Sequence, residues 1–338
     1  MMMKEKVEKN NINLKPYNPS LKTSVWFAEN KQVLSIFLIF LLISIYFGAM
    51  TNAFFSFGNF YNLIQQLAPN LIVVVAMTFI ITTGGIDLSV GSIVALSSAV
   101  TATALQAGVS SPFTFILVIF CGLLVGLVNG YITAYHKIPP FIVTLSSMLY
   151  VRGFALLVTG GYSIAISREH GLVNIGLGTL FGIPISTILA IIIAVIGAII
   201  LINSRFGIYV TGIGANEEAV RRSGVDTRKI KLITYMVSGA AAALAGLIIS
   251  SRLGSGSSNI GLMFEMDIIA AVVLGGTALM GGKGSMMGSL VGVLIIGVIN
   301  NGLTLMQVSP YIIQIIEGTV LLLAVILNIR VFGFKKNN

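Results

Sequence analysis

The sequence predicts an all-α fold, a polytopic integral membrane helix bundle, and three observations support this. First, 56% of the 338 residues are hydrophobic and only 9% are charged, whereas soluble domains carry about 25% charged residues. Second, long stretches without any charged residue occur at 32–86, 88–136, 170–204 and 284–316. Third, the formal net charge of +9 is not gathered on one polar face, which nucleic-acid binding requires. The composition therefore excludes a water-soluble core and a nucleic-acid partner.

The number of membrane-spanning helices follows from the length of the apolar segments. A helix needs about 20 mostly apolar residues to cross the hydrocarbon core, because every backbone polar group must be paired there. Ten segments meet this requirement, so the lipid bilayer is an expected partner. They are 33–52, 62–83, 90–108, 112–134, 140–160, 183–203, 231–251, 264–281, 286–307 and 310–329. The eighth differs from the others because Glu265 and Asp267 lie near its start and several glycines near its end.

The basic residues orient these spans, because loops on the cytoplasmic side of a membrane are enriched in Lys and Arg. With the N-terminus inside, every Lys and Arg falls on the cytoplasmic side except Arg152, Arg168 and Arg252. One span more or fewer would break this pattern along the rest of the chain. We therefore expect about ten transmembrane helices with both termini cytoplasmic.

This topology divides the chain into a transmembrane domain and two tails. We expect a polar cytoplasmic tail at 1–31, a transmembrane domain at 32–330 with a cytoplasmic loop at 205–231, and a basic cytoplasmic tail at 331–338. The first tail is too long and too polar for a cleavable signal peptide, and the apolar segment after it has the length of a membrane span.

The loop at 205–231 contains a segment that predicts a short cytoplasmic helix. The segment opens with a favourable N-cap, carries acidic residues in its first turn and basic residues in its last, and stops at a glycine. In order these residues are Asn216, Glu217, Glu218, Ala219, Arg221, Arg222 and Gly224. Asp226 is expected to cap the span that follows. The segment by itself fits either an interfacial anchor for two spans or a docking helix for a cytoplasmic partner.

Glycine, proline and one acidic residue mark the turns between spans. The expected turn or cap residues are Gly84, Gly85, Asp87, Pro139, Pro140, Gly275 and Gly276. A carboxylate at the membrane edge is functional by default, but Asp87 is also placed to cap the span at 90–108, and this capping role is favoured.

Small and polar residues inside the spans have separate roles. Glycines recur every four residues at Gly122, Gly126 and Gly130 and predict close helix packing. Amide side chains within spans must face the bundle interior or a water-filled path. The candidate path residues are Gln65, Gln66, Asn70, Asn129, Asn300, Asn301 and Gln314. Amides rather than charges indicate a neutral, hydrogen-bonding solute, and helix-to-helix hydrogen bonding is the alternative.

Several catalytic and binding classes are excluded by missing motifs. The glycine-rich stretch 276–285 lacks a Lys directly after its second glycine, so it does not fit a phosphate-binding loop. His136 and His170 lie far apart and Cys121 is the single cysteine, so no metal site is expected. Neither HExxH nor GxSxG occurs. We therefore expect no catalytic residue and no enzymatic activity in this chain.

Several stretches together resemble one family, the permease subunits of bacterial ABC importers for monosaccharides of the ribose, xylose and galactose type. The stretches are Thr83–Ser92, Ile138–Leu145, Arg152–Gly153, Ser204–Gly207, Gly212–Ala219, Ser223–Asp226 and Leu274–Thr277. They follow the family's order over residues 35–330, and their combination is specific although no single piece is.

The resemblance implies partners and a place in the cell. It implies two membrane subunits, identical or different, two cytoplasmic ATP-binding subunits, and an extracytoplasmic sugar-binding protein, in the bacterial plasma (inner) membrane. The segment Asn216–Gly224 is similar to the family's coupling helix, which favours docking to the ATP-binding subunit over anchoring. ATP and Mg would be used by that subunit, and no cofactor is expected on this chain.

The substrate does not follow from the resemblance alone. Related permeases carry autoinducer-2, nucleosides or branched-chain amino acids. An ion-coupled secondary carrier is an alternative of a different class, and it would need a titratable group inside the membrane. Glu317 is the best candidate for that group.

Overall fold

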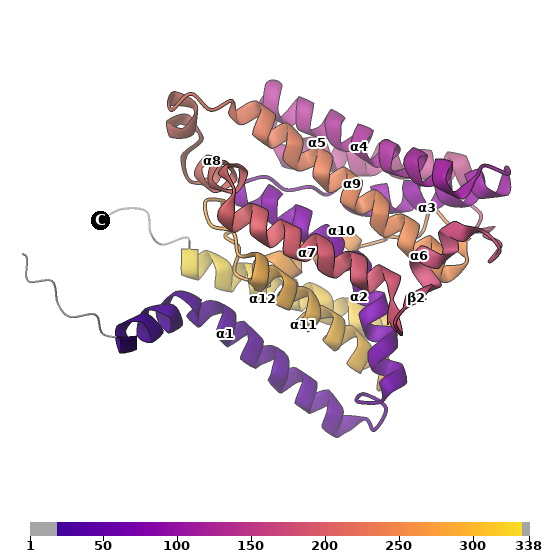
Figure 1. The fold of residues 1–338 in the computed structure, drawn as a ribbon, viewed down its shortest axis with the longest axis horizontal. Helices are drawn as coiled ribbons and strands as arrows, with labels where there is room; N and C mark the ends of the chain where they lie inside the picture. The colour runs from indigo at the N-terminus through magenta and orange to yellow at the C-terminus, as the bar shows by residue number, and fades with distance from the viewer. Residues whose placement is uncertain (1–18, 333–338) are drawn as a thin grey trace, which may run out of the picture.

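The computed structural model describes the backbone of residues 19–332 and the side chains of residues 33–329. Long helices run side by side, and short strands lie outside them (Figure 1). The helices are α1 (Pro19–Met50), α2 (Phe57–Thr82), α3 (Val90–Gln106), α4 (Ser111–Tyr135), α5 (Pro140–Thr159), α6 (Asn174–Leu177), α7 (Ile185–Asn203), α8 (Arg205–Arg222), α9 (Thr227–Leu253), α10 (Phe264–Leu274), α11 (Met286–Leu305) and α12 (Pro310–Phe332). Strand β1 (Ile164–Ala165) pairs antiparallel with β4 (Ser255–Gly256), and β2 (Thr179–Leu180) pairs with β3 (Ile183–Pro184).

The helices confirm the predicted fold class. Each of the ten expected spans contains one helix, and eight of the described helices are long and apolar enough to cross a membrane. Helix α3 has 17 residues, slightly fewer than these eight. Large apolar side chains are exposed on the outer helices, such as Leu42 on α1, Phe120 on α4 and Leu157 on α5, as lipid contact requires. Helix α1 begins inside the segment expected to be a polar tail, of which residues 1–18 lie outside the described part, as do residues 333–338 of the C-terminal tail.

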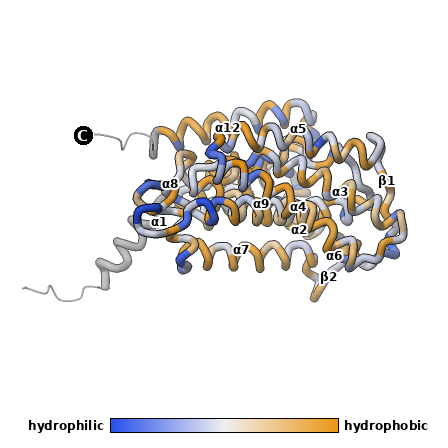
Figure 2. The backbone as a smooth tube through the Cα atoms, turned by 90° about the horizontal axis from the view of Figure 1, so that it is seen from above, coloured by the Kyte–Doolittle hydropathy of each residue, from blue (hydrophilic) through white to orange (hydrophobic). Residues whose placement is uncertain are grey.

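The polar helix α8 lies at one end of the bundle. Figure 1 places the start of α1 and the end of α12 at this same end, and places α6 and β2 at the opposite end. The tube in Figure 2 is hydrophilic around α8 and largely hydrophobic along the long helices. This arrangement agrees with the orientation expected from the basic residues, which puts the 205–231 segment in the cytoplasm.

Helix α9 is the centre of the bundle and packs against α2, α3 and α4. Its close contact with α4 depends on glycine: a Cβ on Gly122 would collide with the carbonyl of Gly239, and a Cβ on Gly239 would collide with the carbonyl of Gly122. Gly126 likewise faces the backbone of Tyr235 on α9. The small-residue face predicted on this span is therefore a helix-packing face, as expected where lipid supplies no hydrophobic drive between helices.

The eighth expected span is wrong in its extent, because α10 ends at Leu274 rather than at residue 281. Helix α10 has 11 residues, about half the length that crosses the hydrocarbon core. Gly276, Gly281 and Gly282 all have positive φ, a conformation that glycine adopts without steric cost and that ends a right-handed helix. An irregular segment at 275–285 therefore completes the passage between α10 and α11.

A second irregular segment, 83–89, joins α2 to α3 and meets the first. The amide of Gly282 donates a hydrogen bond to the carbonyl of Thr82, 3.0 Å away. A Cβ on Gly281 would lie 2.8 Å from the amide nitrogen of Gly84, so the two backbones touch. Non-helical backbone is tolerated at membrane depth only where protein surrounds it, and here each segment provides part of that surrounding for the other.

Candidate functional site

The predicted cytoplasmic helix forms the second half of α8. The helix breaks at Asn216, where the backbone is extended, and the Asn216 side chain then accepts a hydrogen bond from the amide of Ala219 at 3.0 Å. Gly224, with a φ of +87°, ends the segment. Asp226 caps α9 by accepting a hydrogen bond from the amide of Lys229. These observations confirm the predicted N-cap at Asn216, the predicted end of the helix at Gly224 and the predicted cap of α9 at Asp226.

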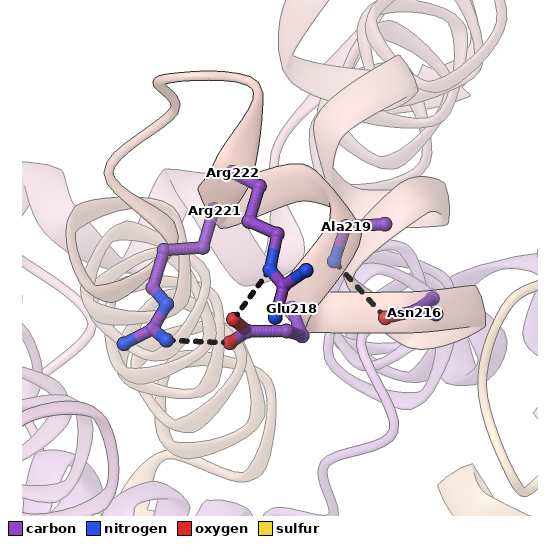
Figure 3. A network of polar contacts seen from close by, with 5 residues as sticks. All are labelled: Asn216, Glu218, Ala219, Arg221 and Arg222. Carbon is purple, nitrogen blue, oxygen red and sulfur yellow. Dashed lines mark hydrogen bonds and ion pairs between the residues drawn. The ribbon is translucent and has the colours of Figure 1, made fainter.

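The exposed face of this half-helix carries a compact charge network (Figure 3). Glu218 lies 2.6 Å from Arg221 and 2.9 Å from Arg222. Hydrogen bonds from Arg221 and then Arg222 hold the pKa of the Glu218 carboxyl below its usual range. Glu217 bonds Lys231 of α9 at 2.5 Å. Glu217 thus fixes the half-helix to the bundle, and Glu218 belongs to a charged surface.

A surface groove of about 410 Å³ runs between this half-helix and the turn before α5. Pro139 and Pro140 form one wall at the start of α5, where Pro140 takes the first helical position. Glu217, Glu218 and Arg221 form the opposite wall. The predicted turn prolines and the predicted docking residues therefore border one concave surface.

The first half of α8 connects this surface to the irregular segments. A Cβ on Gly214 would collide with the carbonyl of Thr82 and with the amide of Gly282. A Cβ on Gly282 would in turn lie 3.0 Å from the Cα of Ala215. Backbone atoms of α8 therefore pack directly on backbone atoms of the 275–285 segment.

Asp87 is fully buried and holds the 83–89 segment against α9. Its Oδ1 accepts hydrogen bonds from the amide and hydroxyl of Ser89, and its Oδ2 accepts one from Ser238 at 2.8 Å. Asn129 of α4 donates to the same Ser89 hydroxyl. The favoured role as a cap of α3 is corrected by this geometry: the N-cap is Ser89, and Asp87 lies two residues ahead, where it accepts from the N-cap amide instead of the first helical turn.

The remaining turn glycines are required either by their backbone conformation or by close contacts. Gly84 and Gly276 have φ of +81° and +84°. A Cβ on Gly85 would lie 2.7 Å from the hydroxyl of Tyr235, and one on Gly275 would collide with the backbone of Gly288. These positions therefore serve turns and close helix packing.

Arg152 ties α5 to the irregular segment before α10. Its guanidinium donates to the carbonyls of Ser258 at 2.7 Å, Ile260 at 2.9 Å and Gly261 at 3.1 Å. Glu265, 5% exposed, lies against Gly91, and its Oε2 finds no hydrogen-bond partner among the described residues. Arg152 thus supplies hydrogen-bond donors to three backbone carbonyls of this segment.

The candidate path residues fall into two groups. Helix-to-helix bonds occupy three of them: Gln65 donates to the carbonyl of Gly176, Asn129 bonds Ser89, and Asn301 exchanges two hydrogen bonds with Asn59. Gln66 is exposed and Asn70 half-buried on α2. Helix-to-helix hydrogen bonding, the alternative role for these amides, is therefore found for several of them.

Asn300 and Gln314 are brought together at a cavity of about 330 Å³ between α10, α11 and α12. Asp267 and Glu317 line the same cavity, and Asn300 donates a hydrogen bond to Glu317 at 2.7 Å. Asp267 was absent from the predicted path, although its place in a span was a usable signal. Among the described residues, no group of three or more His, Cys, Asp or Glu is placed to hold a metal ion.

Comparison with known proteins identifies relatives over nearly the whole chain. Ribose import permease protein RbsC of Escherichia coli (strain K12) is 38% identical over 309 residues, which cover 90% of this chain and 95% of that protein. RbsC of Bacillus subtilis (strain 168) is 40% identical over 296 residues, 87% of this chain and 91% of the relative. Galactofuranose transporter permease protein YtfT of Escherichia coli (strain K12) is 36% identical over 277 residues, which cover 82% of this chain and 81% of that protein.

The family model and the helices lead to the same conclusion as these relatives. No solved structure matches the chain significantly. A protein-family model matches residues 59–325 and is described as "Branched-chain amino acid transport system / permease component". With its apolar helices, the chain is a multi-pass protein of the plasma membrane, and it belongs to this family of importer permease components.

Proposed function

We propose that this chain forms the membrane path of an ATP-driven importer for a monosaccharide, ribose or another simple sugar. The observation that carries the proposal is the set of sugars in the names of its relatives, which are ribose, galactofuranose, galactose or methyl galactoside, and xylose. These relatives align over more than four fifths of the chain.

The family description mentions branched-chain amino acids, but the relatives that align over most of this chain are named for sugars. These relatives favour a sugar over an amino acid as the solute.

Three partners of the importer belong to the proposal, and membership of the permease family supports them. The half-helix from Asn216 to Arg222 would dock in a groove of an ATP-binding subunit, where ATP and Mg²⁺ are used. A binding protein would deliver the sugar from outside, and a second permease subunit would complete the membrane part. Hydrolysis belongs to the partner, so this chain acts as a path and a lever and carries no catalytic step.

Docking transmits a conformational change, because a ligand shifts a two-state equilibrium only through its difference in affinity for the two states. ATP-driven closure of the partner subunits would move α8. Backbone contacts from Gly214 and Ala215 would carry this movement to the 275–285 segment, and that segment borders α10.

The test replaces Glu218 with Lys and leaves Glu217 in place, because Glu217 also holds the half-helix to Lys231 of α9. Uptake of labelled ribose, xylose, galactose and leucine is measured in cells that produce this chain with its ATP-binding subunit and binding protein. We expect sugar uptake to be lost while the amount of membrane-inserted protein is unchanged, because reversed charge disrupts the docking surface. The control is Glu169→Lys, which reverses an exposed charge outside the 205–231 segment. Unchanged sugar uptake in Glu218→Lys would refute docking, and uptake of leucine alone would refute the sugar.

A further inference from the structure

We propose that the cavity between α10, α11 and α12 is a solute-binding site, in which the carboxylates of Asp267 and Glu317 and the amides of Asn300 and Gln314 hold the hydroxyl groups of a neutral polyol. This inference rests on the proposed function and adds the site and the residues that select the solute.

The polar groups of the cavity come from three different helices. Asp267 lies in the first turn of α10, Asn300 near the end of α11, and Gln314 and Glu317 one turn apart on α12. Gln314 is exposed and Asn300 is half-buried with a buried Oδ1, so the polar groups extend from the surface inward. Side chains from three directions are the arrangement by which a pocket fixes the orientation of a small ligand.

Each carboxylate retains hydrogen-bonding capacity. Oε1 of Glu317 accepts from Asn300 at 2.7 Å, and a carboxylate has about four acceptor sites on its two oxygens. No described residue donates a hydrogen bond to the carboxylate of Asp267. The Asn300 Oδ1 is buried and also finds no partner among the described residues. Acceptors are therefore in excess, and the complementary ligand is one that brings several O–H donors.

The charge of the cavity disfavours an anionic solute. Two carboxylates inside a membrane protein are costly without partners, and such groups mark substrate or ion pathways. With no Lys or Arg among the described lining residues, an anion would be repelled. Hydroxyl groups satisfy carboxylates through charge-assisted hydrogen bonds, which is how a neutral sugar would be held.

The rest of the wall is apolar and suits the carbon skeleton of such a solute. Met263, Met266, Ile296, Ile299 and Leu321 line it. The volume of about 330 Å³ lies at the small end of ligand pockets, which range over about 300–1,000 Å³. A single sugar ring is therefore favoured over a disaccharide or a nucleoside.

The cavity is also placed to respond to α8. Asp267 belongs to the short helix α10, and the 275–285 segment that follows this helix packs against Gly214 and Ala215. Movement of that segment would shift one of the two carboxylates relative to the other, which lies on α12. The affinity for the solute would then differ between the two transport states, as directional transport requires.

The test uses the isosteric variants Asp267→Asn and Glu317→Gln in the complete importer, reconstituted in liposomes with saturating sugar-loaded binding protein. Each variant weakens a hydrogen bond from a solute hydroxyl to a charged acceptor. The loss of one such bond should lower the rate of uptake roughly tenfold. The rates are then compared for a series of monodeoxy sugars. Because wild type and variant receive solute from the same binding protein, the preference of that protein cancels in the ratio.

The decisive readout is the coupling between a missing hydroxyl and a missing charge. For the hydroxyl that contacts Asp267, deoxygenation should slow wild-type uptake but change uptake by Asp267→Asn much less, because the two changes remove one interaction. The matched control is Asn301→Ala, on the same helix but paired with Asn59. It removes a structural amide and should leave the ranking of the deoxy sugars as in wild type.

The outcomes separate this inference from the proposed function. Additive effects for every deoxy sugar, with wild-type sugar transport intact, would overturn the site and leave the function standing. Loss of uptake driven by a sodium or proton gradient in Asp267→Asn, without ATP, would assign the carboxylates to an ion and overturn the polyol. Failure of the wild-type importer to accumulate any sugar would refute the proposed function itself.

Discussion

The contact between α4 and α9 gives a prediction whose size follows from the structure. An ideal Cβ on Gly126 would collide with the carbonyl oxygen of Tyr235 and would lie 2.9 Å from the Cα of Met236, whereas ordinary contacts begin at 3.4 Å. Helix α9 would therefore have to move by more than the about 0.5 Å that the Met236 contact alone requires in order to accept Gly126→Ala. A backbone has no alternative rotamer, so we expect a destabilisation of ~1–3 kcal/mol.

The control is Gly153→Ala on α5, where no heavy atom lies within 4 Å of the added Cβ. Alanine favours a helix over glycine by ~0.5–1 kcal/mol at either position. Because this gain is common to both substitutions, the difference between the variants isolates the steric cost.

The assay is the apparent melting temperature of detergent-solubilised protein, followed by fluorescence-detected gel filtration under identical conditions. Gly126→Ala should melt several degrees below wild type, and Gly153→Ala at or above it. If the two variants melted together, close backbone packing between α4 and α9 would be refuted as a source of stability.

Two further predictions concern the buried charges. Arg152→Ala should expose the segment before α10 to protease, because three carbonyls lose their donor. Arg152→Lys should protect this segment only in part, since an ammonium lacks the planar fork of a guanidinium. Equal cleavage of wild type and Arg152→Ala would show that Arg152 does not hold the segment in place. Asp87→Leu should lower the melting temperature more than Asp87→Asn, because a buried hydroxyl without an acceptor costs ~1–3 kcal/mol and leucine leaves Ser89 and Ser238 without theirs. The reverse order would mean that the three hydrogen bonds to Asp87 do not stabilise the protein.

The positions of the helices and the short cytoplasmic helix were determined by sequence alone. Apolar length and capping chemistry are local properties, so a span such as 140–160 and the cap at Asn216 are found within a few residues of their predicted positions. Motif order along the chain was likewise enough to predict the family, and the comparisons confirm it.

The tertiary structure decided which polar residues meet. Asn301 pairs with Asn59, 242 positions away, and Asn300, its neighbour in sequence, faces Glu317 in the cavity. Which partner an amide finds depends on how each helix is rotated about its axis and on its depth in the bundle. Both are set by packing over many helices at once, and glycine contacts such as that between Gly122 and Gly239 fix them.

The length of α10 was also decided by packing. Its apolar composition fits a full span, but Gly275 packs directly on the backbone of Gly288, and Gly276 adopts a positive φ. The chain leaves the helix there because the segment that follows must meet Thr82 and Gly214. Hydropathy measures the cost of burying a residue in lipid and has no term for such contacts, which exist only once the helices are assembled.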